Sequence, residues 1–116
     1  LNPLALLGLG DLNINNPKVA IPFFRKGVSH YPYNPELRRG ISESLARAES
    51  WSEALEHARS WVELDPGNPQ AHFILCQALA NTGRLEEARK ELSLIRKLKP
   101  PRILEYEDWA RRALGR

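Results

Sequence analysis

Few side chains in this sequence have the type and spacing that catalysis or metal binding requires. No two of the histidines, His30, His57 and His72, stand three or four residues apart, the spacing that places two imidazoles on one helix face. The single cysteine, Cys76, excludes an intramolecular disulfide and a cysteine-rich metal centre. Gly8-Leu9-Gly10 lacks the further spacing and the lysine of a phosphate-binding loop. We therefore expect no catalytic residues, no cofactor and no metal site, and a protein that is not an enzyme.

Composition restricts the class of protein further. The chain has 116 residues, of which 42% are hydrophobic and 27% charged, which is ordinary for one globular domain. No apolar run approaches the roughly 20 residues of a membrane span, so we expect this segment not to contact a membrane. The net charge of +3 is small for a nucleic-acid binder. A lone thiol favours a reducing cytoplasm, a periplasmic location stays open, and a start at Leu1 suggests a segment of a larger protein.

The elements that must carry these side chains follow an internal repeat. Pro32, Pro66 and Pro100 are separated by 34 residues (66 − 32 = 100 − 66 = 34), and Ala20, Ala54 and Ala88 keep the same interval. Asn34-Pro35 likewise recurs as Asn68-Pro69. Several matches in one register predict three units, at 1–34, 35–68 and 69–102, followed by 103–116.

Each unit reads as two helices. An Asn-Pro pair opens the first helix, because Asn caps a helix and Pro fits its first position. Apolar residues then recur at helical spacing, as at Ala71, Leu75, Ala78 and Leu79. Pro22 falls inside a predicted helix, where we expect a kink. No segment alternates convincingly with period two, so the fold class is all-α, with about seven helices and no sheet.

These residues resemble the motif of the tetratricopeptide repeat (TPR) family. The family's small residue, at the closest approach of two helices, matches Gly8, Ser42 and Cys76, and its conserved Ala and Pro match the residues spaced by 34. Arg38 and His72 depart from the motif where it has a bulky residue. The resemblance implies a right-handed solenoid of antiparallel helix pairs over 1–116, with 103–116 as a capping helix or as the start of a further repeat.

Volumes in the second helices are complementary. Phe24 stands with Gly27, whereas Ala58 stands with Trp61, three residues apart and so on one helix face. A large residue at one place goes with a small one at the other, which roughly conserves volume. This pattern places Trp61 in the core.

The resemblance also implies a concave groove lined by the first helices. We expect its partner-binding residues to be Leu6, Leu9, Arg39, Glu43, Arg47, Phe73, Ile74, Gln77 and Asn81. Family members that bind chaperone C-termini use a carboxylate clamp of Lys, Asn and Arg. Its places hold Ala5, Leu9, Gly40, Gln70 and Ile74, so we expect a different partner.

Three functions remain open. The leading hypothesis is a protein–protein interaction module, a scaffold or adaptor segment that binds a protein or peptide of unknown identity in the groove. The second is a structural spacer that packs on neighbouring repeats or domains. The third and weakest is nucleic-acid binding through a basic cluster centred on the third unit: Arg89, Lys90, Arg96, Lys97, Lys99 and Arg102.

Overall fold

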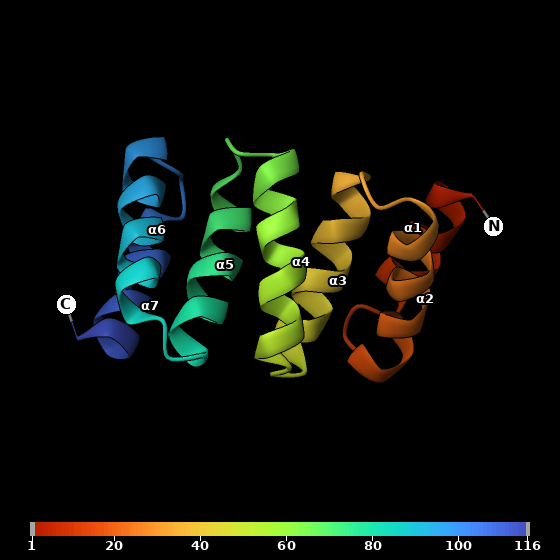
Figure 1. The fold of residues 1–116 in the computed structure, drawn as a ribbon, viewed down its shortest axis with the longest axis horizontal. Coiled ribbons are helices and arrows are strands. Elements are labelled where there is room, and N and C mark those ends of the chain that lie inside the picture. Colours follow the sequence, from red (N-terminus) through yellow and green to blue (C-terminus); the bar gives the residue numbers. More distant parts are fainter. Residues whose placement is uncertain (1, 116) are drawn as a thin grey trace.

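The computed structural model describes residues 2–115, which form seven helices and no strand. The helices are α1 (Pro3–Leu12), α2 (Pro17–His30), α3 (Pro35–Arg47), α4 (Trp51–Leu64), α5 (Pro69–Asn81), α6 (Leu85–Leu98) and α7 (Ile103–Leu114). They follow one another in chain order along the long axis, with α1, α3 and α7 behind α2, α4 and α6 (Figure 1). The all-α solenoid expected from the sequence is confirmed. None of these helices is long and apolar enough to cross a membrane.

The first helices of the three units begin in the same way. Asn2, Asn34 and Asn68 each precede a proline, and each side-chain oxygen accepts the backbone N–H three residues later. Such a cap satisfies a donor that has no partner inside the helix. The three caps therefore mark equivalent positions in α1, α3 and α5.

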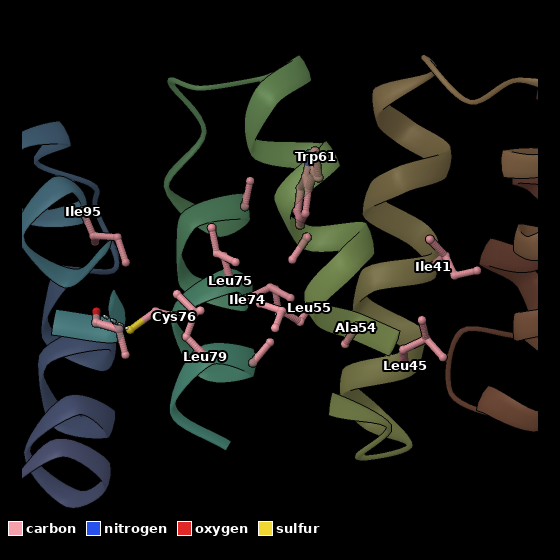
Figure 2. Packing of buried hydrophobic residues seen from close by; sticks show 14 of the residues in the cluster. Ile41, Leu45, Ala54, Leu55, Trp61, Ile74, Leu75, Cys76, Leu79 and Ile95 are labelled. Carbon is pink, nitrogen blue, oxygen red and sulfur yellow. Dashed lines mark hydrogen bonds between the residues drawn. The ribbon is translucent and has the colours of Figure 1, made fainter. Parts of the chain in front are cut away.

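The core lies between the helix pairs. Ala20, Ala54 and Ala88 are fully buried, as a small residue at a helix crossing must be. Trp61 is 1% exposed and belongs to the cluster of buried apolar side chains (Figure 2), which confirms its predicted core position. Gly27, the small residue paired with Phe24, is tightly enclosed, because a Cβ at this position would lie 2.7 Å from the nearest carbon of Leu37.

Polar contacts replace the bulky packing residue in the second and third units. Arg38 donates to the carbonyl oxygen of Pro32 at 2.9 Å and to Nδ1 of His57 at 3.0 Å. His72 makes the equivalent contacts in the third unit. Its Nε2 lies 2.7 Å from the carbonyl oxygen of the proline that corresponds to Pro32, and its Nδ1 lies 3.1 Å from the carboxylate of Glu91. Burial and the Arg38 cation lower the pKa of His57, so its neutral ring accepts the guanidinium N–H. Arg38 and His72 thus each join the first helix of a unit to the second helix of the same unit and to the turn that precedes the unit.

Helix α1 is offset by two residues from the 34-residue register. The buried residues of α1 are Leu6 and Gly10, where the register predicts Leu4 and Gly8. A Cβ at Gly10 would overlap the ring of Phe24, whereas no atom lies within 4 Å of one at Gly8. The expected small residue at the helix crossing is therefore Gly10, and the prediction for Gly8 was wrong.

The turns explain this offset. Helices α3 and α5 are each followed by a left-handed residue, Glu49 (φ 57°) and Gly83 (φ 82°), and the next N–H bonds the carbonyl five residues earlier. The turn at residues 13–16 has no positive φ, and its N–H groups bond carbonyls three residues earlier. A different turn brings another face of α1 onto α2.

Helix α7 runs antiparallel to α6 and is tied to it at both ends. Arg96 of α6 makes two hydrogen bonds of 2.7 Å to the carboxylate of Glu107, and Arg89 donates to the carbonyl of Leu114 at 3.1 Å. The hydrogen bonds between Arg96 and Glu107 raise the pKa of Arg96 and lower that of Glu107. Helix α7 is thereby docked on the third unit.

Candidate functional site: a pocket between three first helices

A pocket of about 480 Å³ lies between α3, α5 and α7. We call it the groove pocket. Its lining residues come from these helices, from the turn after α3, from the first residue of α4 and from the residue before α7: Glu43, Ala46, Arg47, Glu49, Trp51, Gln70, Phe73, Ile74, Gln77, Arg102 and Tyr106. Its volume falls in the range of ligand-sized clefts.

The apolar part of the groove pocket is shared with the tail. The ring of Phe73 lies 4.3 Å from that of Tyr106 and 5.3 Å, edge to face, from that of Trp109. Aromatic pairs at such distances stabilise by about 0.5–1.5 kcal/mol beyond their buried area. Ile74 is only 9% exposed. The Phe73 side chain therefore holds α7 in place as well as lining the cavity.

The polar part centres on Glu43. Its carboxylate accepts a 2.7 Å hydrogen bond from the Gln70 amide and lies 3.6 Å from the Arg39 guanidinium. Burial raises the pKa of Glu43 although Arg39 and Arg47 oppose the shift. Arg39 also reaches Asp11 on α1 at 3.3 Å, so its charge is divided between two carboxylates.

Two charged residues at the pocket rim are more available. Arg47 is exposed and donates a 3.3 Å hydrogen bond to the side-chain oxygen of Asn15. Glu49 is exposed, and within residues 2–115 its carboxylate has neither an ion pair nor a hydrogen bond. Its left-handed backbone is strained for a residue other than glycine. The rim therefore presents one positive and one negative side chain to an incoming molecule.

The structure brings together some of the predicted groove residues but not all. Those that line the groove pocket are Glu43, Arg47, Phe73, Ile74 and Gln77. Arg39 lies next to it through Glu43, and Asn81 is exposed at the end of α5, where it donates to the carbonyl of Gln77 at 2.8 Å.

Leu6 and Leu9 require correction. Leu6 is fully buried and has no surface to offer a partner. Leu9 is half-buried on α1 and does not line the groove pocket. The physical reason is the two-residue offset of α1, which turns Leu6 into the core and leaves Leu9 away from the groove pocket.

Other lining residues were missed. Glu49 lies in the turn after α3, and Trp51 begins α4. Arg102 precedes α7 and Tyr106 lies on it, and the repeat did not specify the placement of α7. A usable signal existed for Glu49, because Gly83 stands 34 residues later and favours a left-handed turn.

No reactive cluster accompanies the pocket. Among the described residues, no three His, Cys, Asp or Glu side chains are placed to hold a metal ion. Burial raises the pKa of the Cys76 thiol to about 12, and its Sγ donates to the carbonyl of Ala88 at 3.2 Å (Figure 2). A neutral, hydrogen-bonded thiol is a packing group.

The three arginines of the basic cluster are all ion-paired. Arg89 contacts Glu86 at 2.8 Å, and Arg102 contacts Glu105 at 2.6 Å. With the Arg96 pair described above, all three guanidinium groups have a carboxylate partner. The unpaired positive charge in this part of the described chain comes from Lys90, Lys97 and Lys99.

Comparisons with known proteins agree on the repeat. Two tetratricopeptide repeat family models match, one over residues 6–69 and the other over 45–107. A curated relative, the protein O-mannosyl-transferase Tmtc2 of Drosophila melanogaster, is 32% identical over 95 residues, which are 78% of this chain and 10% of that protein.

Solved structures show the same fold. The first TPR of Spaghetti (RPAP3), bound to the HSP90 peptide SRMEEVD, is 22% identical with a TM-score of 0.79, covering 92% of this chain and 91% of that one. YrrB, described as a TPR protein with an unusual peptide-binding site, is 24% identical with a TM-score of 0.80, covering 90% and 55%. MamA from AMB-1 is 21% identical with a TM-score of 0.77, covering 84% and 59%.

Proposed function

The chain belongs to the tetratricopeptide repeat family, and we propose that it acts as a protein–protein interaction module that binds a peptide or helix in the groove pocket. The proposed unit is the whole of 1–116 as one TPR domain, with 103–116 as its capping helix. The module is a non-catalytic scaffold or adaptor segment.

One observation carries this proposal: the groove pocket combines an apolar floor with a polar rim. Phe73 and Ile74 offer contacts for an apolar side chain, while the Gln77 amide and the Arg47 and Glu49 charges surround them. Peptide grooves use such apolar anchors for affinity and flanking polar groups for orientation. We propose a partner with one apolar side chain in the pocket, flanked by polar residues.

Two similar structures support a peptide as the partner class. The Spaghetti domain is bound to an HSP90 peptide, and YrrB is described by its peptide-binding site. The chaperone carboxylate is not the proposed ligand, because its clamp residues are absent. The two-residue offset of α1 does not restore the clamp. It moves the two clamp positions of the first unit from Ala5 and Leu9 to Leu7 and Asp11, which are again neither Lys nor Asn.

A spacer role is the second candidate, and the tail favours it. The rings of Tyr106 and Trp109 pack against the ring of Phe73, so part of the apolar surface of the groove pocket already has an intramolecular partner. The chain spans 10% of the length of its curated relative, which fits repeats within a larger protein. The transferase activity of that relative forms no part of the proposal. Nucleic-acid binding is the weakest candidate, because the arginines of the basic cluster are paired.

The test is selection of a binding peptide from a random 12-residue phage library on the wild-type chain, followed by fluorescence anisotropy with the selected peptide. We expect Arg47→Ala with Gln77→Ala to weaken binding by at least about 2 kcal/mol, the size of an interface hot spot. These side chains lie on the rim, so the fold should be unchanged. Phe73→Ala is unsuitable because it also removes contacts to α7.

The matched control is Lys90→Ala, which removes a side chain of α6 outside the groove pocket. It should leave the affinity unchanged. Equal binding by wild type and the rim variant would place the peptide elsewhere, and failure to select any peptide would favour the spacer role.

A further inference from the structure

One face of α1 is apolar and has no partner among the described residues. Leu4 is 79% exposed and Leu12 is 84% exposed, with Gly8 in open space midway between them. Asp11 carries the only charge of this helix. A helix that is apolar on every side is normally buried on every side.

The two-residue offset identifies this face. When the asparagine caps of α1, α3 and α5 are superimposed, four residues of α1 that are not themselves buried correspond to buried residues of both other helices. Ala5, Gly8, Leu9 and Leu12 match Leu37, Gly40, Ile41 and Ser44 in α3, and Ala71, Ile74, Leu75 and Ala78 in α5. All eight counterparts are buried, whereas Gly8 and Leu12 are exposed.

In α3 this face is covered by the second helix of the preceding unit. The ring of Phe24 on α2 fills the space over Gly40 so closely that a Cβ there would overlap it. Leu37 packs against Gly27 of the same helix. Gly8 is the counterpart of Gly40, but none of the described residues covers it.

We infer that the face formed by Ala5, Gly8, Leu9 and Leu12 docks the second helix of a further TPR-type helix pair, with a large side chain over Gly8. This surface continues the α2–α3 and α4–α5 interfaces by one step. It is separate from the groove pocket, which lies between α3, α5 and α7. The inference therefore does not depend on peptide binding.

A second copy of this chain is a poorer occupant. Its second helices α2 and α4 are already packed on α3 and α5, and α6 is backed by α7. The occupant that fits is a helix with a bulky apolar residue and, three residues later, a small one, like Phe24 and Gly27. Few charges are expected on its docking side, since the α1 face offers none.

The test uses an extended chain in which an extra copy of residues 2–34 precedes Pro3. The junction Asn34–Pro3 then reproduces Asn34–Pro35, and the added Phe24 is positioned over Gly8. In the 116-residue chain, Gly8→Ala should raise Tm by a few degrees, because alanine favours a helix and the space is open. In the extended chain the same substitution should lower Tm, as an overlapping Cβ would.

Gly10→Ala is the matched control, and it should lower Tm in both chains because Phe24 already covers Gly10. A rise or no change for Gly8→Ala in the extended chain would overturn the inference. So would a stable dimer of the 116-residue chain in sedimentation equilibrium that Leu12→Glu dissociates, since the occupant would then be a second copy.

Discussion

At the residue scale, Ser42 and Ser44 carry fully buried hydroxyl groups that have no hydrogen-bond partner. A buried polar group without a partner costs roughly 1–3 kcal/mol. The third unit avoids this cost, because Cys76 and Ala78 occupy the equivalent positions. Serine at these two places is therefore a local weakness of α3.

We predict that Ser44→Ala raises the free energy of unfolding by about 1 kcal/mol, since it removes the unpaired oxygen and leaves the methyl-sized volume filled. Urea denaturation followed by circular dichroism measures the change. The control is Ser93→Ala on α6, where the exposed hydroxyl already donates to the carbonyl of Arg89. A lower stability for Ser44→Ala would mean that a buried water or another group satisfies the hydroxyl.

Cys76 supports a second prediction at this scale. Its thiol pKa of about 12 leaves it neutral at pH 8, and the side chain is fully buried. Because only the thiolate attacks a disulfide reagent, DTNB should label the native chain no faster than the chain unfolds. In denaturant, labelling should be complete within the mixing time of a manual assay. Rapid labelling of the native chain would show that α5 and α6 separate locally.

At the element scale, glycine decides how closely helices approach. Phe24 lies between α1 and α3, and it fits because Gly10 and Gly40 provide no side chain on either side. We predict that Gly40→Ala lowers stability by roughly 1–3 kcal/mol despite its better helix propensity, because the Cβ overlaps the ring. Thermal unfolding measures the effect.

The control for that prediction is Gly67→Ala, at a turn with open space around the Cα, which should change stability by less than about 0.5 kcal/mol. In a Phe24→Leu background, the smaller side chain should reduce the penalty of Gly40→Ala. Equal penalties in both backgrounds would indicate that the ring is not the obstacle.

At the scale of the whole molecule, α7 packs against α5 and α6. We predict that deletion of 103–116 lowers Tm or causes aggregation, because it exposes the ring of Phe73 and the apolar face beside it. Light scattering and thermal unfolding test this outcome. Leu104→Glu is the control, since this side chain is 80% exposed on α7 and should not affect docking. A soluble, monomeric 1–102 chain with unchanged Tm would show that α7 contributes no stability.

The sequence by itself determined the repeat, the seven helices and the buried alanines. These features depend on local spacing: Asn-Pro pairs start helices wherever they occur, and Ala20, Ala54 and Ala88 keep one register along the chain. The pairing of Phe24 with Gly27 was readable for the same reason, since residues three apart share a helix face. Several groove residues on α3 and α5 followed from that register as well.

Only the tertiary structure decided the rotation of α1 and the neighbours of Phe73. The face that α1 turns toward α2 depends on the turn at residues 13–16, whose lack of a left-handed residue is a property of backbone angles. For that reason the sequence placed Leu6 in the groove, whereas it is a core residue. Phe73 meets Tyr106 and Trp109 because of where the last turn directs α7, and no spacing within α5 encodes that contact.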